Sequence, residues 1–294
     1  MKHKAGFVNI VGNPNVGKST LMNQLVGERI SIATFKAQTT RHRIMGIVNT
    51  DDMQIVFSDT PGVLKPNYKL QESMLAFSES ALADADVLLY VTDVVENPEK
   101  NMDFLEKVQK MTIPVLLLIN KIDESEQKQL GDIVEKWHSL LPNAEILPIS
   151  AKNKFGVDIL MKRIKELLPE SPAFFDKDQL TDKPARFFVS EIIREKILLY
   201  YDKEVPYSVE VVVERFKEDD RQIHINAVIY VERDSQKGII IGHQGTALKK
   251  VSSEARKTLE KFFDKHIYLE IFVKVDKDWR SSKKELDNFG YNPD

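Results

Sequence analysis

The chain of 294 residues is long enough for two domains that each bury their own core. It contains no cysteine, which excludes a disulfide framework and a thiolate metal site, and its formal net charge of −3 does not distinguish between classes of partner. No uncharged apolar run approaches the roughly 20 residues needed to span a bilayer, so we expect a cytoplasmic protein.

Short apolar runs alternate with helical patterns along the first half of the chain. We predict strands at residues 7–11, 54–58, 87–92, 115–120 and 146–149. Two of these runs are continuously apolar, which is typical of parallel strands that are buried on both faces. The alternation predicts an α/β fold with a doubly wound sheet, in which ligands bind at the carboxyl ends of the strands.

A glycine-rich segment, GNPNVGKST, separates the first predicted strand from the following helix. Its spacing lets a loop wrap a polyphosphate with backbone N–H groups, although a glycine-rich turn between strand and helix is the alternative. If the segment binds phosphate, Lys18 reaches the β- and γ-phosphates and Ser19 binds Mg²⁺ through its hydroxyl. The residues predicted to contact nucleotide here are Gly12, Asn13, Pro14, Asn15, Val16, Gly17, Lys18, Ser19 and Thr20.

A second polar segment, Asp59-Thr60-Pro61-Gly62, follows the next predicted buried strand. Asp59 can hold Mg²⁺ through its water shell, and Gly62 leaves its backbone N–H free to approach a γ-phosphate. Taken alone, this sequence is more often a turn.

A third segment begins where the strand at 115–120 ends. Asp123 can accept hydrogen bonds from N1–H and the 2-amino group of guanine, a pair of donors that adenine lacks. Asn120 can reach the edge of the base and Lys121 can pack its stem along the ring. A helix start is the common alternative for a lone Asn-Lys-Ile-Asp sequence.

A fourth segment, Ser150-Ala151-Lys152, follows the last predicted strand. Ser150 and Ala151 can offer backbone N–H groups to guanine O6, and Lys152 can cover the base. Each segment has an ordinary structural alternative when taken singly. All four occur in order at successive strand ends, and this ordered set predicts a guanine-nucleotide site.

Basic residues are concentrated toward the C-terminus. Residues 1–180 hold 21 Lys/Arg and 24 Asp/Glu, whereas residues 237–284 hold 12 Lys/Arg and 6 Asp/Glu. A polar, proline-punctuated stretch lies between the two regions. We therefore predict a nucleotide-binding domain at residues 1–170, a linker at 171–185 and a second domain at 186–294.

The second domain is predicted to have the element order helix, strand, strand, helix, helix, strand, which is the order of an α+β type II KH domain. Gly242-His-Gln-Gly245 then matches the Gly-x-x-Gly loop that clamps a single-stranded backbone, although a lone match is more often a turn between helices. Trp279 could stack on a base or equally cap the core. The predicted RNA-binding residues are Ile241, Gly242, His243, Gln244, Gly245, Lys249, Lys250, Trp279 and Arg280.

The four nucleotide segments together resemble those of the translation-factor-like GTPases. The phosphate loop, QTTRHR at residues 38–43 and DTPGV at 59–63 are similar to the Era family of bacterial ribosome-assembly GTPases, and so are EIIREK at 191–196 and VPYSV at 205–209. The resemblance implies a mobile segment that supplies Thr40 to Mg²⁺ beside Ser19 and Asp59, with Thr39 as the alternative. It implies that Lys18, Thr40 and Gly62 serve catalysis.

The resemblance also implies the partners. These are GTP and GDP with Mg²⁺, the 3′ end of the small-subunit ribosomal RNA and the 30S subunit, bound by a monomer that is cytoplasmic or peripheral at the inner face of the cell membrane. Related GTPases with Pro-Asn in the loop include potassium-activated members, so K⁺ near Asn15 is a further hypothesis, and a purely structural Asn15 is its alternative. Two other functions are an ATPase or kinase, against which Asp123 argues, and an RNA-binding scaffold that binds nucleotide without hydrolysing it.

Overall fold

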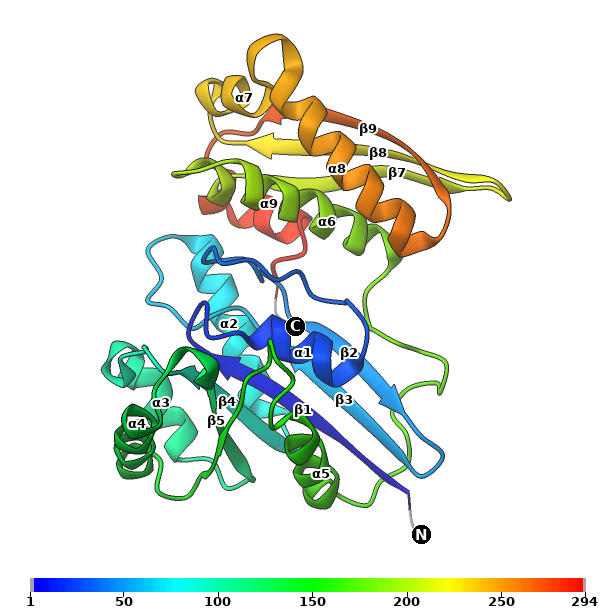
Figure 1. Cartoon of the computed structure of the whole chain (residues 1–294). Coiled ribbons are helices and arrows are strands. Elements are labelled where there is room, and N and C mark those ends of the chain that lie inside the picture. The colour runs from blue at the N-terminus through cyan, green and yellow to red at the C-terminus, as the bar shows by residue number, and fades with distance from the viewer. Residues whose placement is uncertain (1–2, 293–294) are drawn as a thin grey trace. The chain divides into compact units, whose positions relative to one another are not determined.

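The computed structural model describes residues 3–292, which divide into two compact units with a boundary along the chain after Asp182 (Figure 1). Within this range no helix is both long and apolar enough to cross a membrane. Each unit has its own sheet and its own hydrophobic core.

The first unit is built on a six-stranded sheet of order β2-β3-β1-β4-β5-β6. The pair β2–β3 is antiparallel and all other neighbours are parallel, as expected for a doubly wound domain. The strands are β1 (Lys4–Gly12), β2 (Ile44–Asn49), β3 (Met53–Asp59), β4 (Val87–Asp93), β5 (Val115–Asn120) and β6 (Glu145–Pro148). Because β1 and β3–β6 are parallel, their carboxyl ends lie at one edge of the sheet.

Helices cover both faces of this sheet because its central strands are apolar on both sides. One face packs against α2, α3 and α4 around a buried cluster that includes Tyr90 and Trp137, whose ring centroids are 5.6 Å apart. Figure 1 shows α1 and α5 on the other face. The helices are α1 (Lys18–Val26), α2 (Lys69–Ala83), α3 (Met102–Gln109), α4 (Gln127–Leu140) and α5 (Val157–Leu167).

Strand β2 has no counterpart among the predicted strands. It has only six residues, and Gly46 at its centre weakens the β-strand signal. The structure explains the glycine, because a Cβ atom there would lie 2.4 Å from Ile30 Cδ1 and 2.7 Å from Val26 Cγ2. Gly46 is thus required by close packing over the strand.

The segment predicted as a linker is hydrogen-bonded to the first unit over much of its length. Gln54 Oε1 accepts from Phe174 N at 2.7 Å, and Gln54 Nε2 donates to Phe175 O at 2.8 Å. Further along, Ile47 N donates to Leu180 O at 2.8 Å, which places residues 180–182 beside β2. The proline and charged residues of this stretch therefore belong to an extended segment that is hydrogen-bonded to β3 and β2, and not to a free linker.

The second unit has the predicted order of elements, with a three-stranded sheet β7-β8-β9. Its β7–β8 pair is antiparallel and its β8–β9 pair is parallel. Helices α6 and α8 pack on the sheet and share its buried core, in which Ile193, Ala255 and Ile225 are fully buried. The elements are α6 (Ala185–Tyr200), β7 (Glu210–Glu218), β8 (Gln222–Val231), α7 (Asp234–Ile241), α8 (Thr246–Phe263), β9 (His266–Val275) and α9 (Lys283–Asn288).

The predicted fold class, a doubly wound α/β domain followed by an α+β domain with the element order of a type II KH domain, is confirmed. Helix α9 was not predicted. It is a short helix whose N-terminus is capped by Ser282 Oγ, which accepts from Glu285 N at 3.4 Å.

Candidate functional site

The phosphate loop connects β1 to α1 and forms part of a cavity of about 350 Å³. Gly17 has φ 97°, a conformation that favours glycine, and it lets the chain turn directly into α1. From the predicted set, the cavity is lined by Pro14, Asn15, Gly17, Lys18, Ser19 and Thr20. Gly12 and Val16 are buried, and the Asn13 side chain is hydrogen-bonded to Glu96 and Asn101.

Lys18 is buried at the start of α1. Its Nζ donates to Gly12 O at 3.0 Å and to Asn13 O at 2.7 Å. Burial lowers the pKa of Lys18 to about 8, although the negative charges of Asp59 and Glu96 oppose the shift. A polyphosphate bound against the loop would favour the charged form and return this pKa toward its ordinary value.

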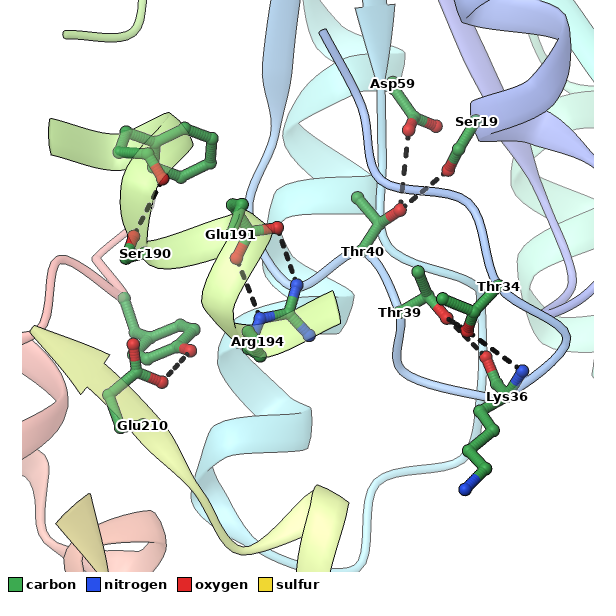
Figure 2. A network of polar contacts seen from close by, with 12 residues as sticks. Ser19, Thr34, Lys36, Thr39, Thr40, Asp59, Ser190, Glu191, Arg194 and Glu210 are labelled. Atoms are coloured by element: carbon green, nitrogen blue, oxygen red, sulfur yellow. Dashed lines mark hydrogen bonds and ion pairs between the residues drawn. The ribbon is translucent and has the colours of Figure 1, made fainter. Parts of the chain in front are cut away.

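Three oxygen-bearing side chains meet between α1, the segment before β2 and the end of β3 (Figure 2). Ser19 Oγ lies 2.8 Å from Thr40 Oγ1, and Thr40 Oγ1 donates to Asp59 Oδ2 at 3.4 Å. Asp59 is fully buried, and burial raises its pKa above the ordinary value against the opposing charge of Lys18.

The other carboxylate oxygen, Asp59 Oδ1, is buried without a hydrogen-bond partner among the described residues. A buried carboxylate oxygen of this kind calls for a ligand. Hydroxyl and carboxylate oxygens are also the donors that Mg²⁺ prefers. Ser19, Thr40 and Asp59 therefore fit the magnesium site that the sequence predicts.

The neighbouring Thr39 has a different environment (Figure 2). Its Oγ1 donates to Lys36 O at 2.6 Å and lies 2.7 Å from Thr34 Oγ1. These contacts hold the loop in shape, whereas Thr40 is the threonine beside Ser19 and Asp59. The geometry thus favours Thr40 over Thr39 as the metal ligand.

The segment after β3 lies directly on the phosphate loop. A Cβ atom on Gly62 would lie 2.7 Å from Pro14 Cα, so this close approach requires glycine. Thr60 is fully buried and its Oγ1 donates to Ile10 O at 2.8 Å, which makes its side chain a support for the segment rather than a phosphate contact. Pro61 is also buried.

The predicted base-recognition segments are tied together by Asn120. Its Nδ2 donates to Val16 O at 2.8 Å, and its Oδ1 accepts from Ala151 N at 2.9 Å. Ser150 N donates to Phe155 O at 3.1 Å. Both amides that were expected to meet guanine O6 are therefore engaged within the chain, so a contact from Ala151 would require Asn120 to release it.

Asp123 and Lys152 are exposed at this end of the sheet. Asp123 lies in a short 3₁₀ helix, Ile122–Glu124. Neither Asp123 nor Lys152 lines the cavity. Lys121, which does line it, has its Nζ 2.7 Å from Asp93 Oδ2 at the end of β4. This ion pair holds Lys121 in place beside the position expected for the base.

Several residues at this site have no sequence motif. Phe35, which is 74% exposed, lines the cavity together with Ala33, Thr34 and Lys36. Glu96 and Asn101 follow β4 and contact the phosphate loop through Asn13. Their positions relative to the loop depend on how β1 and β4 pair, which a linear pattern does not reveal.

The predicted RNA clamp is a turn between α7 and α8. Gly242, Gln244 and Gly245 all have positive φ, at 71°, 50° and 76°, and His243 and Gln244 are exposed. Lys249 and Lys250 are exposed on α8, with Lys250 Nζ 4.3 Å from the centre of the Tyr200 ring. Ile241 is half-buried and packs against the core.

The structure places Trp279 and Arg280 differently from the RNA-binding role considered for them. Trp279 is fully buried and its Nε1 donates to Ser208 O at 3.0 Å, so its ring belongs to the core and cannot stack on a base. Arg280 pairs with Glu232 and also donates to Tyr207 O. Both residues thus stabilise the second unit.

Comparisons with known proteins cover both units. The family model of the 50S ribosome-binding GTPases matches residues 7–121, and that of the KH domain matches residues 204–280. GTPase Era of Clostridium kluyveri is 43% identical over 290 residues, or 98% of this chain and 99% of that protein. Two Era structures each have a TM-score of 0.94 and 38% identity, and cover 99% of this chain and 100% of their own. One is in complex with MgGDPNP and nucleotides 1506–1542 of 16S ribosomal RNA, and the other is an Aquifex aeolicus variant bound to GDP and AlF4⁻.

Guanine specificity can be tested at Asp123. Asp123→Asn replaces one acceptor by a donor and should weaken GTP binding by roughly 2–3 kcal/mol, or about 30- to 160-fold in Kd. Xanthosine triphosphate, which carries an oxygen at position 2, should bind this variant better than GTP. Calorimetry or a fluorescent nucleotide would measure both affinities. Glu124→Gln removes the same charge one residue away and should leave the GTP affinity unchanged; equal GTP affinity of Asp123→Asn and the parent chain would remove Asp123 from the site.

Proposed function

The chain belongs to the Era family of GTPases, and from this premise we propose that it hydrolyses GTP as a switch that governs its binding to the 3′ end of the small-subunit ribosomal RNA. One observation carries the proposal. A phosphate loop and a fitting set of magnesium ligands lie at one sheet edge of the first unit, in a chain whose second unit presents the Gly242–Gly245 turn.

Hydrolysis proceeds by attack of a water molecule on the γ-phosphorus, in line with the leaving oxygen. Lys18 and the N–H groups of the loop stabilise the negative charge that develops on the phosphate oxygens. Ser19, Thr40 and Asp59 would hold Mg²⁺, which when bound neutralises charge on those oxygens. Gly62 brings its backbone next to the loop, where its N–H can approach the γ-phosphate.

The residue after Gly62 is Val63, which is buried. In Ras-like GTPases this position carries a glutamine that orients the attacking water. A valine side chain can neither donate nor accept a hydrogen bond, so other groups must orient the water. We therefore expect slow intrinsic turnover that a bound partner or cation accelerates.

The second unit binds RNA through the main chain of its turn. Because three residues of the turn have positive φ and two of them are glycines, the backbone is open to a phosphodiester. Lys249 and Lys250 follow on the exposed side of α8 and add positive charge. Era has been solved in complex with nucleotides 1506–1542 of 16S ribosomal RNA, and this supports the same target for this chain.

This target defines the wider setting. Since the RNA is part of the 30S subunit, we propose that the chain acts as a monomer in cytoplasmic 30S assembly, with GTP binding coupled to RNA binding. Peripheral membrane association is a separate family expectation, which co-sedimentation with anionic vesicles would test.

The proposed function predicts that GTP and GDP compete for one site and that ATP does not. Phosphate release from GTP should require Mg²⁺ and change when RNA from the 3′ end of 16S ribosomal RNA is added. Stronger competition by ATP than by GDP would support an ATPase instead. Nucleotide binding with no phosphate release, with or without RNA, would support the non-hydrolysing scaffold.

RNA binding can be tested at the glycines of the turn. Replacing Gly242 or Gly245 by Asp should reduce RNA affinity while GTP affinity holds, because a negative charge then faces the phosphodiester. Gly245 is the sharper position, because a Cβ there meets nothing within 4 Å whereas one on Gly242 would lie 2.6 Å from Ala247 Cβ. Electrophoretic mobility shift would measure a loss of about tenfold or more for Gly245→Asp.

Two variants separate charge from shape in this test. Gly245→Asn tolerates positive φ about as well as Asp but carries no charge, so it should bind RNA better than Gly245→Asp. Gly131→Asp adds the same charge in open space on α4 and should bind RNA like the parent chain. Unchanged RNA affinity of both Gly242 and Gly245 variants would place the clamp elsewhere.

Potassium activation is the expectation for Asn15. This residue is exposed on the cavity wall, and its side chain makes no hydrogen bond to any of residues 3–292. Its amide oxygen is thus available to bind a monovalent cation. A cation that also contacts nucleotide oxygens would supply positive charge beside the phosphates. Phosphate release should be faster in KCl than in NaCl at equal ionic strength, and Asn15→Ala should abolish the difference.

The backbone of Asn15 calls for a second variant. Its φ is 67°, a conformation that Ala adopts only with strain, whereas glycine adopts it freely. Asn15→Gly therefore removes the amide and keeps the loop shape. Loss of potassium dependence in both variants supports the cation site; equal rates of the parent chain in the two salts would make Asn15 structural.

A further inference from the structure

A ring of hydrogen bonds joins the phosphate loop to the segment after Gly62. Val63 N donates to Gly12 O at 3.0 Å. Asn101 Nδ2 donates to Val63 O at 3.0 Å and to Asn13 Oδ1 at 2.5 Å. Because Gly12 and Asn13 are adjacent in the chain, these hydrogen bonds form a closed ring through Val63 and Asn101. Val63 is thereby held at both its N–H and its carbonyl group.

The ring has a defined orientation because Glu96 sets the direction of the Asn13 amide. Asn13 Nδ2 donates to Glu96 Oε1, and Thr92 Oγ1 donates to Glu96 Oε2 at 2.6 Å. An ionised carboxylate accepts hydrogen bonds and cannot donate them, so the nitrogen of Asn13 must face Glu96 and its oxygen must face Asn101. The amide group of Asn101 then uses both of its hydrogens, one for Asn13 and one for Val63.

We propose that Asn101 is a positioning residue for GTP hydrolysis that acts through Val63 and Asn13. The inference rests on hydrolysis of GTP at this site. With valine in place of a water-orienting side chain, the main chain of Gly62, directly before Val63, is the part of this segment that lines the cavity and can face the γ-phosphate and its water. Asn101 does not line the cavity, and it fixes the main chain of Val63 next to Gly62, which does line it.

Asn101 is well placed for this task. It is the last residue of a 3₁₀ helix, Pro98–Asn101, that leads into α3. The helix N-terminus is held separately by Asn97 Oδ1, which accepts from Glu99 N at 3.1 Å. The amide of Asn101 is therefore supported by regular structure on both sides, and an error of about 1 Å in such a support can cost on the order of a hundredfold in rate.

Glu96 adds a pH signature to the ring. Burial raises the pKa of Glu96 to about 7, and the charged groups that act on it are Asp93, which raises it, and Lys18 and Lys100, which lower it, while Tyr90 also lies nearby. Below this pH the carboxyl group is protonated, so its hold on the Asn13 nitrogen weakens. Turnover should thus fall as the pH drops through about 7, and Glu96→Gln should show less of this dependence.

The test compares single-turnover phosphate release with GTP affinity in four variants of the full chain. Asn101→Ala should lower the rate about tenfold while the Kd for GTP stays within about threefold. Asn101→Asp, which can only accept, should lose more than Asn101→Ala, and Asn101→Gln should recover part of the loss. Asn97→Ala disturbs the same 3₁₀ helix without touching the ring and should keep the parent rate.

A double-mutant cycle tests whether the residues of the ring act together. If Asn13 and Asn101 act together, Asn13→Ala combined with Asn101→Ala should lose little more than either change alone. Unchanged rates in Asn101→Ala and Asn101→Asp would overturn the inference, as would additive losses or equal losses of rate and GTP affinity. Absence of phosphate release in the parent chain would instead refute the proposed function, so the two failures are distinguishable.

Discussion

The central strands of the first unit, β1, β3, β4 and β5, are parallel and almost entirely buried, and this constraint decides where its chemistry can lie. A charged side chain within β4 or β5 would be desolvated among apolar neighbours, so the polar residues gather where the strands end. The same packing removes water from that edge. It shifts the pKa of Lys18 downward and that of Asp59 upward, in both cases toward the neutral form. The protein alone thus holds these charges at a cost, which a ligand carrying both phosphate and a divalent cation offsets.

In both units, glycines leave a segment of main chain exposed or in close contact with another loop, and buried side chains hold that segment in position. In the first unit, the segment after β3 reaches the phosphate loop because Gly62 has no Cβ, while Thr60 holds it from below. In the second, the turn before α8 exposes its backbone because Gly242 and Gly245 allow positive φ. Just before this turn, Ile240 is fully buried and its carbonyl oxygen accepts from the buried Tyr201 Oη at 2.7 Å. The glycines of the motifs and the buried residues beside them therefore act together to position the main chain, although only the glycines form recognisable sequence patterns.

The sequence predicts what depends on local chemistry and misses what depends on packing between distant segments. The alternation of strands and helices and the four nucleotide segments are visible because each has its own spacing. Glu96 and Asn101 are not visible, since they meet Asn13 only when β4 pairs with β1. Trp279 is a residue that the sequence does single out but whose role it leaves open. A tryptophan suits both stacking on a base and packing in a core, and only the burial of Trp279 distinguishes the two roles. Likewise, composition suggests a linker at residues 171–185 because the partners of this segment, Gln54 and β2, lie far away in sequence.

The extended segment beside β2 has a consequence for solubility. Strand β2 is the last strand on its side of the sheet, and unpaired edge strands are templates for aggregation between copies of a protein. Here Leu180 O accepts from Ile47 N, Thr181 Oγ1 donates to Met45 O and Asp182 Oδ1 accepts from Met45 N. These contacts occupy hydrogen-bonding groups that would otherwise face another molecule. A fragment cut at residue 170, where composition changes, would lose this cover, whereas one cut after residue 182 would keep it and should be less prone to self-association.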